Sequence, residues 1–514
     1  MKILCVYPHY PDTFWSFRHA LKLISKKAAY PPLGLLTVAA MLPEEWEEKL
    51  VDMNVTNLSD EDIKWADYVF ISAMVVQRKS VKEVITRCNK LNKPVVAGGP
   101  LFTTGHEEFN GVDHFVLGEA EVTLAPFLTD LKNGCAKHLY TSSGQWPNIT
   151  KTPIPMWSLI NMNKYASMNI QYSRGCPFSC DFCDIIILNG HKPRTKTKDQ
   201  ILAELEALRA NNWRGSVFIV DDNFIGNKKK LKAEILPAII TWMREKKHIF
   251  SMFTEVSINL VDDEELMQMM GEAGFGRVFI GIETPNEDSL AECNKFTNKN
   301  RDLVASVKKI QNYGFEVQGG FIVGFDSDPL SIFRNQINFI QNSGIVTAMV
   351  GLLNAPRGTE LYQRMKKENR LLTTMSGDNM DFSLNFIPKM NQQTLINGYK
   401  QILNTIYSPK QYYERVTTFL KEFKPKKRKE EVLHLQAYHI EGLLKSMWVL
   451  GIKEKGRRYY WKFFFATLFK YPHSFPLSIS LSVYGFHFRK VIEQYINLPT
   501  EKFMNLDGSC GASG

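Results

Sequence analysis

Residues 173–183 read SRGCPFSCDFC, a stretch that places Cys176, Cys180 and Cys183 in the spacing Cys-x3-Cys-x2-Cys. The chain has 514 residues and eight cysteines, and the other five are scattered: Cys5, Cys88, Cys135, Cys293 and Cys510. Three thiolates on one short loop can hold three irons of a [4Fe–4S] cube and leave the fourth iron open to a small molecule. A four-cysteine zinc site requires a partnering cysteine pair, which this sequence lacks. The stretch therefore predicts an iron–sulfur centre in a reducing compartment, with a zinc loop or three buried thiols as the alternative.

The cysteine loop follows the first of six apolar segments that alternate with helical patterns. These expected strands lie near residues 168–172, 216–220, 250–256, 277–282, 316–323 and 347–353. Parallel strands joined by helices close into a barrel whose chemistry lies at the carboxyl ends of the strands. Residues 166–365 are therefore predicted to form a partial (β/α)6 barrel.

The first 140 residues show the same alternation of strands and helices. The expected strands lie at residues 3–7, 50–53, 68–72, 94–99 and 114–119. Continuous apolar strands between helices indicate a parallel sheet covered on both faces, here a Rossmann-like α/β domain over residues 1–140. Such sheets bind ligands beyond the carboxyl ends of their strands. The polar or glycine residues at those ends are Asp52, Ser72, Gly98, Gly99, Gly118 and Glu119. Residues 141–165, with three prolines, are predicted to link this domain to the barrel.

Residues 366–514 are predicted to form a mainly α-helical, basic and aromatic domain. Thirteen Lys and Arg but only five Glu lie between residues 421 and 470, which supplies most of the net charge of +10. Such helices suit an anionic membrane surface, RNA or a solvated face beside the barrel, and we favour the membrane. No apolar stretch reaches the roughly 18 residues of a spanning helix, and the start of the chain lacks a signal-peptide layout. We therefore expect a cytoplasmic protein with peripheral contact at the inner face of the membrane.

Three features of the sequence each resemble a known protein family. The cysteine loop at the first barrel strand, with Phe182 before its last cysteine, resembles the radical S-adenosylmethionine (SAM) superfamily. The segment Tyr30-Pro31-Pro32-Leu33-Gly34-Leu35 and the glycine-rich strand ends resemble the cobalamin-binding domain found upstream of many such barrels. The whole layout, with residues 11–17, resembles the bacterial hopanoid A-ring (C-2) methylases and their relatives. One departure is that the Asp-x-His-x-x-Gly motif of other cobalamin proteins is absent, since residues 52–56 read DMNVT.

The resemblance implies three cofactors and their ligands. It implies that Cys176, Cys180 and Cys183 ligate a [4Fe–4S] cluster. It implies that SAM binds at strand ends with carboxylates or glycines, namely Asp222, Glu255, Glu283, Gly319 and Gly320. It implies that cobalamin binds at the N-terminal strand ends already named. Each acidic residue could instead be a helix cap or a surface charge.

The resemblance also implies a reaction. Methylcobalamin and a 5′-deoxyadenosyl radical would methylate an unactivated carbon of a lipid, hopanoid-like substrate. A flavodoxin- or ferredoxin-type protein would supply electrons, and no nucleic-acid partner is expected. The main alternative is a radical cyclase or carbon–carbon coupling enzyme on the same scaffold. An RNA methylthiotransferase or a cobalamin or redox sensor fits the sequence less well, because the further cysteines that a methylthiotransferase needs are too dispersed.

Overall fold

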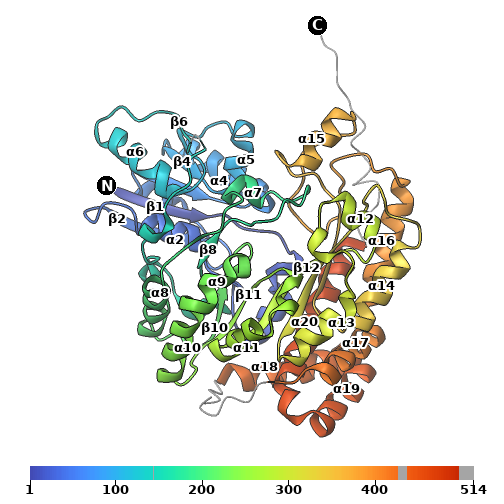
Figure 1. Ribbon diagram of the computed structural model, residues 1–514. Helices are drawn as coiled ribbons and strands as arrows, with labels where there is room; N and C mark the ends of the chain where they lie inside the picture. Colours follow the sequence, from blue (N-terminus) through green and yellow to red (C-terminus); the bar gives the residue numbers. More distant parts are fainter. Residues whose placement is uncertain (143, 426–436, 497–514) are drawn as a thin grey trace.

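The computed structural model describes residues 1–142, 144–425 and 437–496. It contains two parallel six-stranded sheets followed by a group of helices (Figure 1). The two sheets, with helices on their faces, confirm the predicted α/β class.

The N-terminal sheet is doubly wound. Its strands pair in the order β2-β1-β3-β4-β5-β6. They are β1 (Lys2–Tyr7), β2 (Glu47–Asp52), β3 (Tyr68–Ser72), β4 (Val95–Gly98), β5 (His114–Val116) and β6 (Leu139–Tyr140). Because side chains alternate along a strand, Leu4 and Val6 pack on one face while Ile3 and Cys5 pack on the other.

Helices cover both faces of this sheet. The face that holds Leu4 is covered by α3 (Asp60–Trp65), α4 (Arg78–Lys90) and α5 (Pro100–Gly105). The opposite face is covered by α2 (Leu33–Ala39) and α6 (Ala120–Lys132). Two separate cores result, and the carboxyl ends of the strands remain at one edge.

The second sheet is an open barrel. Its parallel strands run in the order β14-β13-β12-β11-β10-β7, so β7 and β14 are the two edges of the sheet. They are β7 (Ser167–Ile170), β10 (Ser216–Ile219), β11 (Ser251–Glu255), β12 (Phe275–Glu283), β13 (Glu316–Val323) and β14 (Ala348–Leu352). Each overlaps one of the six predicted strands, so the partial barrel is confirmed.

Helices connect successive barrel strands. The longer ones are α8 (Lys198–Ala210), α10 (Leu236–Glu245), α11 (Glu264–Ala273), α13 (Leu303–Asn312) and α14 (Ile332–Ser343). The shorter ones are α7 (Ile185–Asn189), α9 (Lys228–Lys230) and α12 (Glu287–Glu292), and α15 (Glu360–Lys367) follows the last strand. A small hairpin of β8 (Ser173–Arg174) and β9 (Arg194–Thr195) flanks the cysteine loop, and neither strand was predicted.

The C-terminal region is helical, as predicted, and packs against the later barrel elements (Figure 1). Its helices are α16 (Gln392–Ile406), α17 (Pro409–Glu422), α18 (Ala437–Trp448), α19 (Arg457–Lys470) and α20 (Phe475–Ile496). Most of the basic run at residues 424–429 lies outside the described residues. Within the described residues, no helix is long and apolar enough to cross a membrane.

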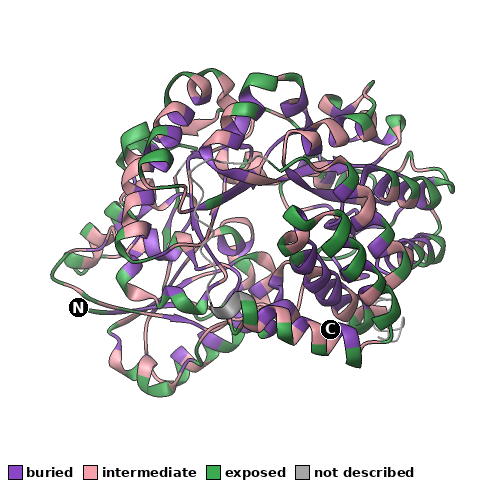
Figure 2. Cartoon of the chain, turned by 90° about the horizontal axis from the view of Figure 1, so that it is seen from below, coloured by how far each residue is buried: buried purple, intermediate pink, exposed green. Residues whose placement is uncertain are grey.

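One large core unites the barrel, the C-terminal helices and part of the N-terminal segment. Side chains between residues 14 and 29, including short helix α1 (Arg18–Leu21), pack in this core and not in the N-terminal sheet. Phe14 stacks on Phe488 of α20 with 4.0 Å between the ring centroids. Figure 2 shows buried residues along the strands and the inner sides of the helices. The domain limits at residues 140, 165 and 365 stay a prediction.

Candidate active site

The cysteine loop is fixed at its first turn by a carboxylate from the barrel. Gly175 has a φ of +96°, and a Cβ there would approach the carbonyl oxygens of Gly190 and Lys192 to 2.9 Å, so only glycine suits this position. The Gly175 N–H donates to Asp222 Oδ2 at 2.7 Å, and the Asn189 side chain donates to the same carboxylate. Asp222, which follows β10, therefore holds the backbone next to Cys176.

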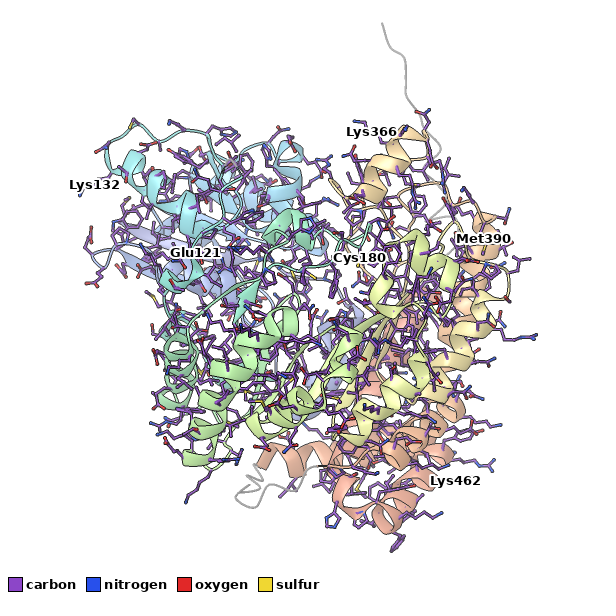
Figure 3. The ribbon with its side chains drawn as sticks, in the orientation of Figure 1. Glu121, Lys132, Cys180, Lys366, Met390 and Lys462 are labelled. Atoms are coloured by element: carbon purple, nitrogen blue, oxygen red, sulfur yellow. The ribbon has the colours of Figure 1, made fainter. Side chains whose placement is uncertain are left out.

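The three thiols lie in a sheltered environment near the centre of the molecule, where Figure 3 labels Cys180. Cys180 is buried, and Cys176 and Cys183 are half-buried. Burial raises the pKa of all three thiols, while the positive charge of Lys295 opposes that rise. Since metal binding replaces the thiol protons, loading the loop would release protons.

The donor chemistry of the loop fits an iron–sulfur cluster. Thiolates are the usual ligands of such clusters, and three are available on one loop. Among the described residues, no three Cys, His, Asp or Glu side chains are grouped closely enough to bind a metal as they stand. Since each thiolate of such a cluster binds a different iron, the three thiols need not converge on one ion.

Glu283, at the end of β12, is engaged by a cation. Its Oε1 lies 2.9 Å from Lys295 Nζ, and both side chains are largely buried. The pair stands beside the cysteine loop, because Lys295 acts electrostatically on Cys180. The predicted SAM contact at Glu283 thus has a partner already, and no pattern in the sequence pointed to Lys295.

The other predicted SAM residues differ in their surroundings. Burial, with help from Asp222 and Asp221, raises the pKa of Glu255 to about 8. The carboxyl at the end of β11 is therefore largely neutral at pH 7 in the protein as described. A Cβ on Gly319 or Gly320 would come 2.8 Å from Phe321 or 2.9 Å from Phe279, respectively. Aromatic packing accounts for both glycines.

A cavity of about 680 Å³ opens between the N-terminal sheet and the barrel. Its lining is mostly carbon and includes six aromatic residues: Tyr7, Tyr10, Trp15, Tyr30, Phe70 and Phe218. Its volume lies within the range of about 300–1,000 Å³ that is typical of small-molecule sites. Of the predicted residues, those that line it are Ser72, Gly98, Gly99, Gly118, Glu119 and Asp222. Asp52, Glu255, Glu283, Gly319, Gly320 and the three cysteines are outside the lining that the described residues form.

The turn after β4 permits close approach of backbone to a ligand. Gly99 has a φ of +87°, and a Cβ there would lie 2.6 Å from Ser72 Oγ. A Cβ on Gly98 would lie 2.7 Å from the Val116 carbonyl oxygen. These positions accept only glycine without rearrangement, and they leave polar backbone at one wall of the cavity.

Asp52 lies in a buried hydrogen-bond network between the two domains. Its carboxylate accepts from the Tyr165 hydroxyl at 3.0 Å and from the Asn54 side chain at 2.8 Å, and it is buried. Tyr165 precedes the first barrel strand. Asp52 therefore joins the N-terminal sheet to the barrel and is not among the residues that line the cavity, and its contact with cobalamin stays a prediction.

A buried network of ion pairs connects the two domains beside the cysteine loop. Arg174 pairs with Glu119 at 2.5 Å and with Glu121 at 2.8 Å, and Arg194 pairs with Glu119 at 2.5 Å. The four side chains are at most 15% exposed. Arg174 lies two residues before Cys176, while both glutamates belong to the start of α6. Of these four residues, only Glu119 was predicted as a site residue. The one sequence signal for Arg174 as its partner was the position of this arginine two residues before Cys176.

Three family models match the chain. The radical SAM superfamily matches residues 170–340, the B12 binding domain matches residues 23–128, and a domain of unknown function, DUF4070, matches residues 359–499. The chain is 40% identical to an uncharacterised methyltransferase of Synechocystis sp., over 96% of this chain and 93% of that protein. It is 32% identical to the hopanoid C-2 methylase of Rhodopseudomonas palustris, over 90% of this chain and 88% of that protein.

The chain belongs to the cobalamin-dependent radical SAM methyltransferase family. Solved structures share its fold. The cobalamin-dependent radical enzyme OxsB, with aqua-cobalamin and SAM bound, has a TM-score of 0.61 at 14% identity, covering 99% of this chain and 82% of its own. The methyltransferase TsrM from Kitasatospora setae, with cobalamin and a [4Fe–4S] cluster, has a TM-score of 0.60 at 13% identity, covering 96% of this chain and 100% of its own.

Membership confirms the predicted class of enzyme and its cofactors. This radical SAM methyltransferase uses a [4Fe–4S] cluster, SAM and cobalamin, and it requires an external reductant and a small-molecule substrate. The residues that bind each cofactor remain proposals.

Proposed function

We propose that this methyltransferase acts on an unactivated carbon of a polycyclic lipid, of the kind named for its hopanoid C-2 methylase relative. The observation that carries the proposal is the largely apolar cavity between the domain that binds cobalamin and the barrel. Burial of hydrocarbon surface against an apolar wall is favourable, so this cavity suits a hydrocarbon substrate. Aromatic side chains there exclude water from reactive species.

Different residues of the chain would bind the cluster, cobalamin and SAM. Cys176, Cys180 and Cys183 would hold the cluster, with Asp222 orienting their loop through Gly175. The glycine turn after β4, with Ser72 and Gly118, would face cobalamin. Glu255 and Glu283 would face the cationic end of SAM, whose positive charge would favour the ionised form of Glu255. When bound, these cofactors supply the radical and methyl chemistry, and the protein supplies geometry and shelter.

The reaction is tested with reconstituted enzyme, SAM, methylcobalamin, a strong reductant and a polycyclic lipid extract. We expect 5′-deoxyadenosine, S-adenosylhomocysteine and a lipid heavier by one methylene. A flavodoxin or ferredoxin should replace the chemical reductant. Deoxyadenosine without methyl transfer from any extract would contradict methylation and favour the cyclase or coupling alternative.

A cavity variant tests the placement of cobalamin and substrate. Gly34 lines the cavity from helix α2, and a Cβ there would meet nothing within 4 Å. Gly34→Leu should therefore fold normally, keep its cluster and lose cobalamin or product. Gly276→Val is the matched control, since a Cβ at Gly276 also meets nothing within 4 Å and this residue is outside the cavity lining. Full cobalamin retention and turnover by Gly34→Leu would contradict the placement.

A further inference from the structure

A row of exposed apolar side chains follows α18 and the π-helical turn after it, Val449–Lys453. Ile440, Leu444, Trp448 and Ile452 recur every four residues and are 50–61% exposed. Residues four apart lie on the same side of a helix, so these four form one stripe. Exposed apolar residues are ordinary when single, but a continuous stripe marks an interaction surface.

The stripe continues onto α19. The Trp461 indole N–H donates to the Gly451 carbonyl at 2.9 Å, beside Ile452, and the Trp461 ring stacks on Phe465 at 5.7 Å. Phe465 and Phe469, four residues apart, are 51% and 78% exposed. We call Ile440, Leu444, Trp448, Ile452, Phe465 and Phe469 the C-terminal apolar face.

Positive charge surrounds this face. Seven Lys and Arg but only two Glu lie between residues 437 and 474. Lys453 Nζ lies 5.6 Å from the Trp448 ring, and the exposed Arg457, Arg458 and Lys462 lie on α19. A nucleic acid would pair with the cations but leave the aliphatic side chains unused. A surface with anionic headgroups above acyl chains would satisfy both.

We propose that the C-terminal apolar face docks the enzyme on an anionic lipid bilayer, an inference that rests in part on the lipid substrate proposed above. The face also adjoins the segment that reaches the cavity. Ser25 donates to Glu441 of α18 at 3.0 Å, and Thr13, Trp15 and Ser16 of the same segment line the cavity. Residues 13–25 thus run from the cavity to α18. Docking through α18 would therefore place the bilayer next to the end of this segment that lies farther from the cavity.

Vesicle co-sedimentation of the full chain tests the proposal without cofactor or substrate, so a failure of methyl transfer does not affect it. The wild type should bind vesicles of phosphatidylglycerol and phosphatidylcholine more tightly than vesicles of phosphatidylcholine alone, and added salt should weaken binding. Trp448→Ser with Phe469→Ser should lower binding roughly tenfold. Leu330→Ser is the matched control, because Leu330 is 72% exposed but precedes α14.

The charge contribution is tested separately. Lys455→Glu with Lys462→Glu should weaken binding about fivefold for each lysine lost. Lys366→Glu with Lys367→Glu on α15 should leave it unchanged, and Figure 3 shows Lys366 and Lys462 at opposite ends of the molecule. The proposal is overturned if the wild type binds neither kind of vesicle, or if both lysine pairs have equal effects. It is also overturned if the Trp448 and Phe469 changes leave vesicle binding unchanged and alter only the oligomeric state of the protein.

Discussion

Cys180 and Lys295 illustrate how single residues prepare the cluster site. Burial opposes ionisation of the thiol, and the nearby ammonium favours it. Glu283, at 2.9 Å, in turn stabilises the ammonium in this buried place. Lys295 thus lowers the pKa of the Cys180 thiol, while the paired Glu283 carboxylate raises it.

The thiol assignment leads to a first prediction. Cys180→Ala should abolish both the cluster absorbance and SAM cleavage in anaerobically reconstituted protein, because one iron loses its ligand. Cys293→Ala is the control, since Cys293 is a buried thiol in a neighbouring apolar cluster. Retention of a full cluster by Cys180→Ala, or its loss in Cys293→Ala, would contradict the assignment.

Glu255 leads to a prediction about pH. Its pKa is raised to about 8 by burial, whereas a glutamate in an unfolded chain has a pKa of about 4.3. Between these values the folded protein binds more protons than the unfolded chain, so the free energy of unfolding falls as the pH rises. Asp221, whose pKa is raised to about 7 by burial, adds a slope of the same sign.

Glu255→Gln cannot ionise and should remove part of that slope. Without cofactors, the variant should be more stable than the wild type near pH 8 by roughly 1–3 kcal/mol, and the difference should vanish toward pH 4. Thermal unfolding across this range measures it. A stability difference that does not change with pH would show that Glu255 does not titrate in this window.

At the scale of elements, the hairpin β8–β9 and helix α6 depend on Arg174. Removing one partner of a buried ion pair is costly because a charge remains without compensation. A lysine cannot reproduce the forked contacts of a guanidinium with two carboxylates. The pairing therefore couples the cobalamin domain to the first turn of the cysteine loop.

Arg174→Lys should lower the free energy of unfolding by roughly 3 kcal/mol and reduce the amount of cluster that the protein retains. Arg209→Lys, which alters the partly exposed pair with Glu206, should change stability by about 1 kcal/mol or less. Denaturant unfolding and iron content measure the two effects. Equal effects of the two substitutions would contradict a role of the Arg174 ion pairs in positioning the cysteine loop.

The sequence allowed the long elements to be predicted but not the short ones. Strands such as β3 and β13 have continuous apolar residues between turn signals, so pattern alone locates them. The two-residue strands β6, β8 and β9 have no period to detect. Cys176, Cys180 and Cys183 were evident from spacing. The pairing of Glu119 with Arg174 was not, because 55 residues separate them and only the fold brings them together.

At the scale of the whole molecule, the two ends of the described chain share one core. Phe14 is fully buried, its ring stacks on Phe488, and its carbonyl oxygen lies 3.0 Å from His487 Nε2. The same segment reaches the cavity at Thr13 and Trp15. The C-terminal helices thus support a wall of the site although none of their described residues line it.

Phe14→Ala should therefore weaken α20, although Phe14 and Phe488 are 474 positions apart in the sequence. Truncation of a buried phenylalanine costs about 3–5 kcal/mol, and here the loss falls on the contact between the two chain ends. Limited proteolysis should cleave the C-terminal helices faster in this variant. Phe102→Ala, a similar truncation inside the core of the N-terminal sheet, should leave that cleavage rate unchanged. If Phe102→Ala exposes the C-terminal helices equally, the molecule unfolds as one unit, and the contact between its ends has no separate role.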